Sequence, residues 1–420
     1  MSDSPSSGRP PASRRRVLIT VGGLTELSVL GTGASPTAAA DSGDRQWTFE
    51  TGGVVASSPT VADETVFVGA WDGNLYAVDA ETGEREWTFE TGNQVWSAPA
   101  VADDTVFVGS ADGNLYAVDA ETEEQRWAFE TPDPIQSSPT VTDDTVFVGS
   151  LDNSLYAVDA ESGEQRWSFE TGDVVFSSPT VTDGTVFVGS VDAHLYAVDA
   201  ETEEQRWAFE TGDEIPSSPT VADGTVFVGS LDDSLYAVDV ETGERRWAFE
   251  TASGVDSSPT VTDGTVLVGS RDGNLYAIAA ETGERRWAFE TDGMVQSSPT
   301  VADGTVFVGS HDETLRAVDV ETGERRWAFE TGGRIDSSPT VVDGTVFVGS
   351  FDFGLYAVDA GVDASSEGSR VRLGTLGHYG ASATSDTVPG FGIGGAVTGI
   401  GGAAYLFKRW LGDAPDETHE

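Results

Sequence analysis

Carboxylates and histidines are the side chains in this sequence that could act as catalysts or metal ligands. Asp72 has copies every 40 residues, and Asp79 has copies in nearly every repeat. Because they recur in this way, we expect both to be turn residues. Four histidines are present, without the spacing of metal ligands: His194, His311, His378 and His419. There is no cysteine, and no triad, P-loop or dinucleotide motif. The sequence therefore predicts no catalytic residue and no metal ligand.

Residues that differ between the repeats are better candidates for binding. Two connections vary freely: the five residues beginning with "GGVVA", and the four residues after each "VGS". If the repeats surround an axis, the last residue of the first connection should line the mouth of a central channel. In chain order these residues are Ala56, Trp96, Gln136, Phe176, Pro216, Asp256, Gln296 and Asp336. The second connection should add a wider ring, with Trp71, Arg271, His311 and Phe351.

Ten of these side chains form the candidate ligand-binding face. They are Trp71, Trp96, Gln136, Phe176, Asp256, Arg271, Gln296, His311, Asp336 and Phe351. Aromatic rings beside amides and carboxylates could stack on and hydrogen-bond a flat or sugar-like ligand, or a peptide. Trp96 is expected to be exposed, which would mark a binding surface. The alternative is unselected variation at exposed loop tips.

The elements that position these residues follow from the 40-residue repeat. Each repeat contains four short β-type runs, "SPTV", "TVFVGS", "LYAVD" and "RWAFET", separated by turn signals such as Asp-Gly. Small residues and a proline suit the first run to the innermost edge, and charges suit the last run to the outer edge. The sequence predicts an all-β fold, an eight-bladed β-propeller of four-stranded antiparallel blades. Residues 46–51 should complete the blade formed by 337–360 and close the ring.

The motif "AVDAETGERRW" resembles the tryptophan-docking motif of PQQ (pyrroloquinoline quinone) repeat propellers. That family includes quinoprotein dehydrogenases and BamB-like assembly lipoproteins, and the resemblance covers about 47–360. It implies that each docking tryptophan is clamped against the motif of the neighbouring blade. The tryptophans concerned are Trp47, Trp87, Trp127, Trp167, Trp207, Trp247, Trp287 and Trp327. Glu123 and Glu203 replace the motif's glycine, and Ala279 replaces its aspartate.

Charge restricts the possible partners. The formal net charge is −49, from 71 acidic and 22 basic residues. Such a field repels nucleic acid, which we therefore exclude as a partner. The composition favours adaptation to molar salt, where the Debye length is about 3 Å and self-repulsion is screened.

The two ends of the chain carry possible targeting signals. Residues 1–40 resemble a twin-arginine signal peptide, with a basic run at Arg14–Arg16 and a following apolar stretch. Residues 41–360 would be the propeller and 361–387 a linker. Residues 388–410 are a candidate membrane or sorting segment, followed by an acidic tail, 411–420. This segment resembles the surface-sorting signal of halophilic archaea, with the motif Pro389, Gly390 and Phe391.

We therefore expect an exported propeller anchored at the extracellular face of the membrane through its C-terminal segment. It would be a monomeric, non-enzymatic binding or assembly scaffold for a surface protein, a peptide or a glycan. The alternatives are a dehydrogenase dependent on PQQ and Ca²⁺, and a structural surface component. No cofactor is predicted outside the dehydrogenase alternative.

Overall fold

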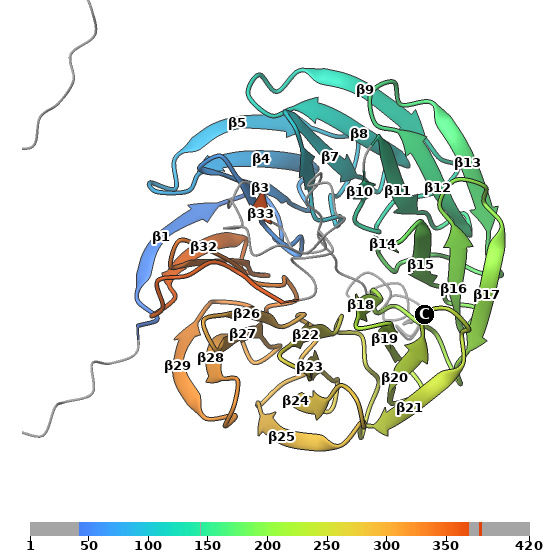
Figure 1. The fold of residues 1–420 in the computed structure, drawn as a ribbon. Helices are drawn as coiled ribbons and strands as arrows, with labels where there is room; N and C mark the ends of the chain where they lie inside the picture. Colours follow the sequence, from blue (N-terminus) through green and yellow to red (C-terminus); the bar gives the residue numbers. More distant parts are fainter. Residues whose placement is uncertain (1–41, 143, 369–377, 380–420) are drawn as a thin grey trace, which may run out of the picture. The chain divides into compact units, whose positions relative to one another are not determined.

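The structure, a computed structural model, describes residues 42–142, 144–368 and 378–379. All of them belong to one compact unit, Ala40–Glu420. Eight antiparallel sheets surround a central axis as the blades of a propeller (Figure 1). The predicted fold class is confirmed. The expected signal segment 1–40 and the sorting segment 388–410 lie outside the described residues.

Blades 1 to 4 each use four consecutive strands, from the innermost outwards. They are β2 (Thr60–Ala62), β3 (Thr65–Gly69), β4 (Asn74–Asp79) and β5 (Arg85–Glu90); β6 (Ala100–Ala102), β7 (Thr105–Gly109), β8 (Asn114–Asp119) and β9 (Gln125–Glu130); β10 (Thr140–Thr142), β11 (Thr145–Gly149), β12 (Ser154–Asp159) and β13 (Gln165–Glu170); β14 (Thr180–Thr182), β15 (Thr185–Gly189), β16 (His194–Asp199) and β17 (Gln205–Glu210).

Blades 5 to 7 follow the same order, and blade 8 joins both ends of the repeat region. The strands are β18 (Thr220–Ala222), β19 (Thr225–Ser230), β20 (Ser234–Asp239) and β21 (Arg245–Glu250); β22 (Thr260–Thr262), β23 (Thr265–Gly269), β24 (Asn274–Ala279) and β25 (Arg285–Glu290); β26 (Thr300–Ala302), β27 (Thr305–Gly309), β28 (Thr314–Asp319) and β29 (Arg325–Glu330); β30 (Thr340–Val342), β31 (Thr345–Gly349), β32 (Gly354–Asp359) and β1 (Arg45–Glu50).

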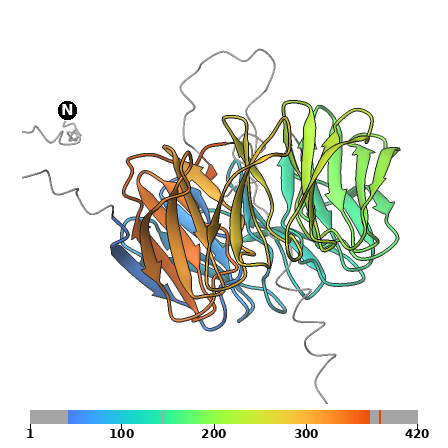
Figure 2. The same ribbon diagram turned by 90° about the horizontal axis from the view of Figure 1, so that it is seen from below.

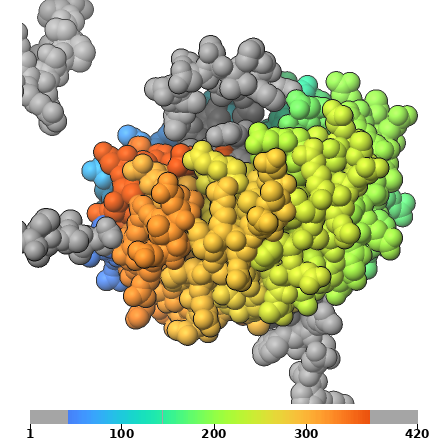
Figure 3. Space-filling model, turned by 60° about the horizontal axis from the view of Figure 1, so that its bottom comes forward, coloured from blue at the N-terminus to red at the C-terminus, as the bar shows by residue number. Residues whose placement is uncertain are grey.

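Each blade buries both faces, as the continuous apolar runs predict. Successive residues of a strand point to opposite faces, so Phe67 of β3 packs toward blade 2 while Val66 and Val68 pack toward blade 8. Every interface between blades repeats this arrangement of aromatic and aliphatic side chains against valines. Figure 3 shows blades 5 to 8, green through orange, as one continuous outer wall.

The docking tryptophans link neighbouring blades, as the resemblance implies. Each indole Nε1 donates to a backbone carbonyl 33 residues further along the chain, in the next blade, at 2.9–3.1 Å. In the six blades that have glycine at this motif position, the indole ring covers that glycine. A methyl group at Gly83 would lie 2.7 Å from the Trp47 ring, and Gly83 has a φ of +72°. Glycine therefore suits this position in both space and backbone conformation.

The ring is closed by the amino-terminal strand, as predicted. β1 pairs with β32, with Thr48 opposite Tyr356. The docking motif of blade 8 is itself assembled from the two ends of the propeller. The backbone carbonyl of Asp359 accepts a hydrogen bond from the amide of Gly43. Gly43 thus has the position in blade 8 that Gly83 has in blade 1. Trp327 donates to the carbonyl of Ala360, beside Gly43.

A second set of contacts closes the ring around the channel. The hydroxyl of the first threonine in an innermost strand donates to the proline carbonyl of the next blade. Thr340 of blade 8 completes the circle by donating to Pro59 of blade 1, at 2.7 Å. Blade 2 has Ala100 at this position, which has no hydroxyl to donate. The interface between blades 2 and 3 therefore lacks this threonine-to-proline hydrogen bond.

The chain that follows blade 8 returns to the innermost strands. Ser366 bonds both the amide and the carbonyl of Val341 in β30, at 2.8 and 2.9 Å. The amide of Glu367 donates to Val301 in β26, and β33 (His378–Tyr379) pairs in parallel with β2 (Figure 1). Part of the segment expected to be a linker thus contacts blades 7, 8 and 1.

Candidate functional site

The connections between strands gather at two rims, seen with the blades edge-on in Figure 2. The variable rim consists of residues 51–56 and 70–73 and their copies at 40-residue intervals. Its two kinds of connection are hydrogen-bonded to one another; for example, the Trp71 amide donates to the Val54 carbonyl at 2.9 Å. The uniform rim consists of turns 63–64 and 80–83 and their copies. The divergent connections therefore share one rim, as the repeat pattern predicts.

The recurring aspartates Asp72 and Asp79 organise turns, as expected. Asp72 on the variable rim accepts hydrogen bonds from the Gly52 amide, the Asn74 amide and the Tyr76 hydroxyl at 2.6–3.1 Å. Burial and this hydrogen bond to Asp72 raise the pKa of Tyr76 to about 12. On the uniform rim, Asp79 accepts from the Thr82 amide and hydroxyl. The carboxylates of Asp72 and Asp79 are thus engaged in hydrogen bonds that stabilise turns.

An aromatic cluster forms where blades 8, 1 and 2 meet. Ring centroids of Trp71 and Trp96 are 4.1 Å apart, and those of Trp71 and Phe351 are 5.2 Å apart. The expectation that Trp96 is exposed is wrong, since it is 7% exposed. Its ring packs against Trp71 and Ala56, and its Nε1 donates to Gln94 Oε1 at 3.1 Å. Trp71 and Phe351 are each partly exposed, so they are the rings of this cluster that solvent can reach.

Polar side chains occupy the same rim in blades 6 to 8, and together they are called the polar cluster. It consists of two groups: Asp256 with Arg271 and Gln296, and Asp336 with His311 and Arg334. Arg271 Nε lies 2.7 Å from Asp256 Oδ2, and Gln296 Nε2 donates to the same oxygen. His311 Nε2 lies 2.8 Å from Asp336 Oδ1, and Arg334 Nε lies 3.4 Å from Asp336 Oδ2. Asp256 and Asp336 are each 1% exposed. The sequence correctly grouped five of these residues on one rim, without showing that they pair with one another.

Arg334 was missed by the sequence reasoning, and it joins the two clusters. Its guanidinium carbon lies 3.8 Å from the centroid of the Phe351 ring, a cation–π arrangement, while its Nε faces Asp336. A signal was present, because "GGRID" is the one copy of this connection that contains an arginine. Gln136 and Phe176 belong to blades 3 and 4. Phe176 is buried and Gln136 is half-buried.

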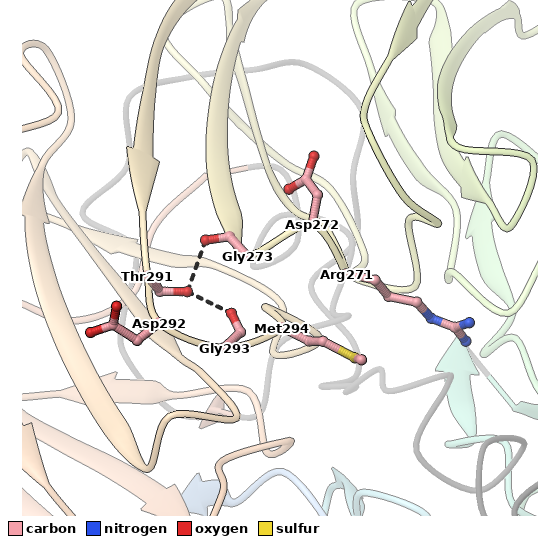
Figure 4. A pocket seen from close by; sticks show the side chains of 7 residues that line it. All are labelled: Arg271, Asp272, Gly273, Thr291, Asp292, Gly293 and Met294. Atoms are coloured by element: carbon pink, nitrogen blue, oxygen red, sulfur yellow. Dashed lines mark hydrogen bonds between the residues drawn. The ribbon is translucent and has the colours of Figure 1, made fainter.

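A shallow hollow of about 360 Å³ lies beside the polar cluster, between blades 6 and 7 (Figure 4). It is lined by residues 271–273 of blade 6 and by residues 291–294 of the following connection. Thr291 Oγ1 donates to the carbonyls of Gly273 and Gly293 and fixes the two connections together. The side chains of Arg271 and Met294 extend to the same side of the hollow. Met294 is 42% exposed.

The described residues contain neither a metal-binding cluster nor a membrane-spanning helix. No group of three or more histidine, aspartate or glutamate side chains is placed to hold a metal ion in that part of the chain. Nor do the described residues contain a helix of the length and hydropathy that a membrane span requires.

Two family models each match part of the chain. Residues 249–362 match the family "outer membrane protein assembly factor BamB", and residues 33–223 match the family "beta-alanine-activating enzyme, beta-propeller". No curated protein sequence matches the chain.

Solved structures show the same architecture. BamB from Moraxella catarrhalis has a TM-score of 0.66 at 20% identity, over 75% of this chain and 99% of that chain. The computationally designed protein Ika8 has a TM-score of 0.69 at 18% identity, over 76% and 99%. At these identities the likeness shows the fold alone.

Proposed function

We propose that this chain is an exported, surface-anchored and non-enzymatic scaffold that binds its partner on the variable rim. The observation that carries the proposal is the distribution of differences among eight otherwise similar blades. The differing side chains occupy one rim, and those of five blades form two clusters joined by Arg334. The match to the assembly factor BamB supports a scaffold role. Repeat proteins commonly place binding residues on one face while the other elements keep the frame.

Site-specific photo-cross-linking tests which rim meets the partner. A photoreactive residue is placed at Met294 or Phe353, which are 42% and 48% exposed on the variable rim. Matched controls carry it at Glu121 or Glu241, which are exposed on the uniform rim. Cross-linking in intact cells should give a discrete adduct from the variable rim alone. Equal adducts from both rims, or adducts from the uniform rim only, would contradict the proposal.

Export and anchoring rest on the two end segments and need separate tests. Replacing Arg14 and Arg15 with lysine should retain the precursor inside the cell, because twin-arginine export requires that pair. Deleting 388–420 should release the propeller into the medium. Either variant found on the cell surface would remove that part of the proposal.

The proposal includes no cofactor and no catalytic residue. Addition of PQQ and Ca²⁺ to the purified protein should therefore give no bound quinone absorbance and no alcohol-dependent reduction of a dye. Dye reduction that depends on both additions would replace the scaffold with the dehydrogenase alternative.

A further inference from the structure

The polar cluster contains buried oxygen atoms that no described residue satisfies. Asp256 Oδ1, Gln296 Oε1 and both carboxylate oxygens of Asp336 have no hydrogen-bond donor among the described residues. The three side chains belong to residues that are 1–3% exposed. An unsatisfied buried polar group costs about 1–3 kcal/mol, so a molecule that supplied donors to these four atoms would be stabilised at this rim. These three residues occupy the same position in three consecutive blades.

Donors in the cluster are unsatisfied as well. Arg271 Nη2 and Arg334 Nε have no acceptor with hydrogen-bond geometry in the described part of the chain. His311 Nε2 is close to Asp336 Oδ1 but is not aligned to form a hydrogen bond with it. A molecule that satisfies this cluster must therefore both donate and accept hydrogen bonds.

The charges of the cluster restrict the class of molecule. Two carboxylates, Asp256 and Asp336, face two guanidinium groups, those of Arg271 and Arg334. The formal charges of these four groups cancel. A buried ionic ligand would add an uncompensated charge, which is costly away from water. A neutral ligand with several hydroxyl groups avoids that cost.

The aromatic cluster supplies the apolar half of the site. Arg334 connects it directly to the polar cluster, since its guanidinium covers Phe351 and its Nε faces Asp336. Phe351 in turn contacts Trp71. A pyranose ring has apolar C–H faces and an edge of hydroxyl groups, so one sugar could contact aromatic rings and hydrogen-bonding groups together. Figure 4 shows the adjoining hollow on the Arg271 side, where a second sugar unit could extend.

We propose that the variable rim binds a neutral saccharide through Asp256, Gln296, Arg334 and Asp336, with its apolar face toward Phe351 and Trp71. This inference rests on the proposed function and specifies the chemistry of the partner as a glycan. It assigns the unsatisfied oxygens to sugar hydroxyl donors and the unsatisfied arginine nitrogens to sugar oxygen acceptors.

Isothermal titration calorimetry on the full chain tests the inference directly. The probes are glucose, galactose, mannose, N-acetylglucosamine, maltose and cellobiose, compared with the cation glucosamine and the anion glucuronate. At least one neutral probe should bind with a millimolar or lower Kd, and the matching charged probe should bind at least 10-fold more weakly. Tighter binding of a charged probe would overturn the assignment of a neutral ligand. Absence of binding by all neutral probes would mean that water alone satisfies the cluster, and would also overturn it.

Substitutions locate the binding site. Gln296→Ala and Asp336→Asn should each weaken binding at least 10-fold, because each removes an acceptor from the cluster. Gln205→Ala and Asp223→Asn are matched controls at exposed positions away from the variable rim and should leave the affinity unchanged. Unfolding curves identify any variant that fails to fold, and the other cluster variant then decides the question. Unchanged affinity in a folded cluster variant would reject this site.

The two proposals fail in different experiments. If no saccharide binds while variable-rim cross-linking still gives an adduct, the scaffold proposal stands and the glycan assignment falls. If a saccharide binds at the cluster while cross-linking favours the uniform rim, the glycan site stands and the protein-scaffold role falls.

Discussion

Gly43 lies against the indole ring of Trp327, where a methyl group on Gly43 would come within 3.0 Å of the ring. These two residues are at opposite ends of the repeat region, yet they form the same docking contact as Trp47 with Gly83. The tryptophan–glycine contact formed by the two ends of the propeller is thus the same kind of contact as those between blades made of consecutive strands.

Closure through this contact predicts the effect of Gly43→Ala. Gly43 has a φ of +102°, and the added methyl group would press on Trp327, so we expect a loss of about 1–2 kcal/mol. Gly83→Ala, within the ring, is the matched control and should cost a similar amount. Chemical denaturation measures both.

Deletion of 41–55 removes β1 entirely and should abolish cooperative unfolding; a deletion variant that unfolds like the intact protein would disprove closure.

Removing a docking tryptophan should destabilise two blades. Trp127 is buried and donates to Ala160 of the next blade at 3.0 Å, so Trp127→Ala should cost about 3–5 kcal/mol. Trp127→Phe keeps much of the packing and should cost clearly less. Urea unfolding monitored by circular dichroism gives both values. Equal losses for the two variants would show that packing of the ring does not determine the effect.

Two glutamates stand where the docking motif has glycine elsewhere, and replacing them should stabilise the ring. Glu123 and Glu203 have φ of 59° and 60°, a conformation that costs non-glycine residues about 1–2 kcal/mol. Glycine is more flexible in the unfolded chain, so Glu123→Gly or Glu203→Gly should gain about 0.5–1 kcal/mol. Glu124→Gly, one residue further on, is the control and should not stabilise. Thermal unfolding distinguishes them.

Alkaline pH should destabilise the blades through their tyrosines. Burial, and then hydrogen bonding to an aspartate, raises the pKa of Tyr76, Tyr116, Tyr156 and Tyr276 to about 12. The folded state therefore retains protons that the unfolded state loses near pH 10. This stabilisation is complete below pH 10 and disappears between pH 10 and 12. Phenolate absorbance and unfolding curves measured in parallel test this; titration near pH 10 without loss of stability would contradict it. Tyr76→Phe should remove the part of this pH-dependent stabilisation that Tyr76 contributes.

Low salt should destabilise the protein. With a formal net charge of −49, repulsion between carboxylates grows as the Debye length increases from about 3 Å at 1 M to about 30 Å at 0.01 M. Dialysis to tens of millimolar salt should lower the melting temperature and shift the tryptophan fluorescence. An unchanged melting temperature would argue against adaptation to molar salt.

The 40-residue period made the fold predictable in detail, since one strand pattern and its truncated last copy determine blades, strand order and closure. The docking role of Trp47 was implied by the resemblance of the repeated motif to that of PQQ-repeat propellers. The pairing of Asp256 with Arg271 was not predictable, because two side chains 15 residues apart can share a rim without contact. The burial of Trp96 results from packing against Trp71 and Ala56 of the adjacent blade. Packing between connections is set by side-chain conformations that a repeat pattern does not encode.

Pairing of β1 with β32 also has a consequence for synthesis of the protein. Contacts such as that between Thr51 and Phe353 join residues 302 positions apart. At about 5–20 residues per second, a ribosome needs about 15–60 s to make the intervening chain. During that interval β1 lacks the strand with which it pairs in the complete structure, and the propeller cannot close. A prematurely terminated chain would keep apolar edges exposed. Proteases would therefore degrade incomplete molecules faster than complete ones.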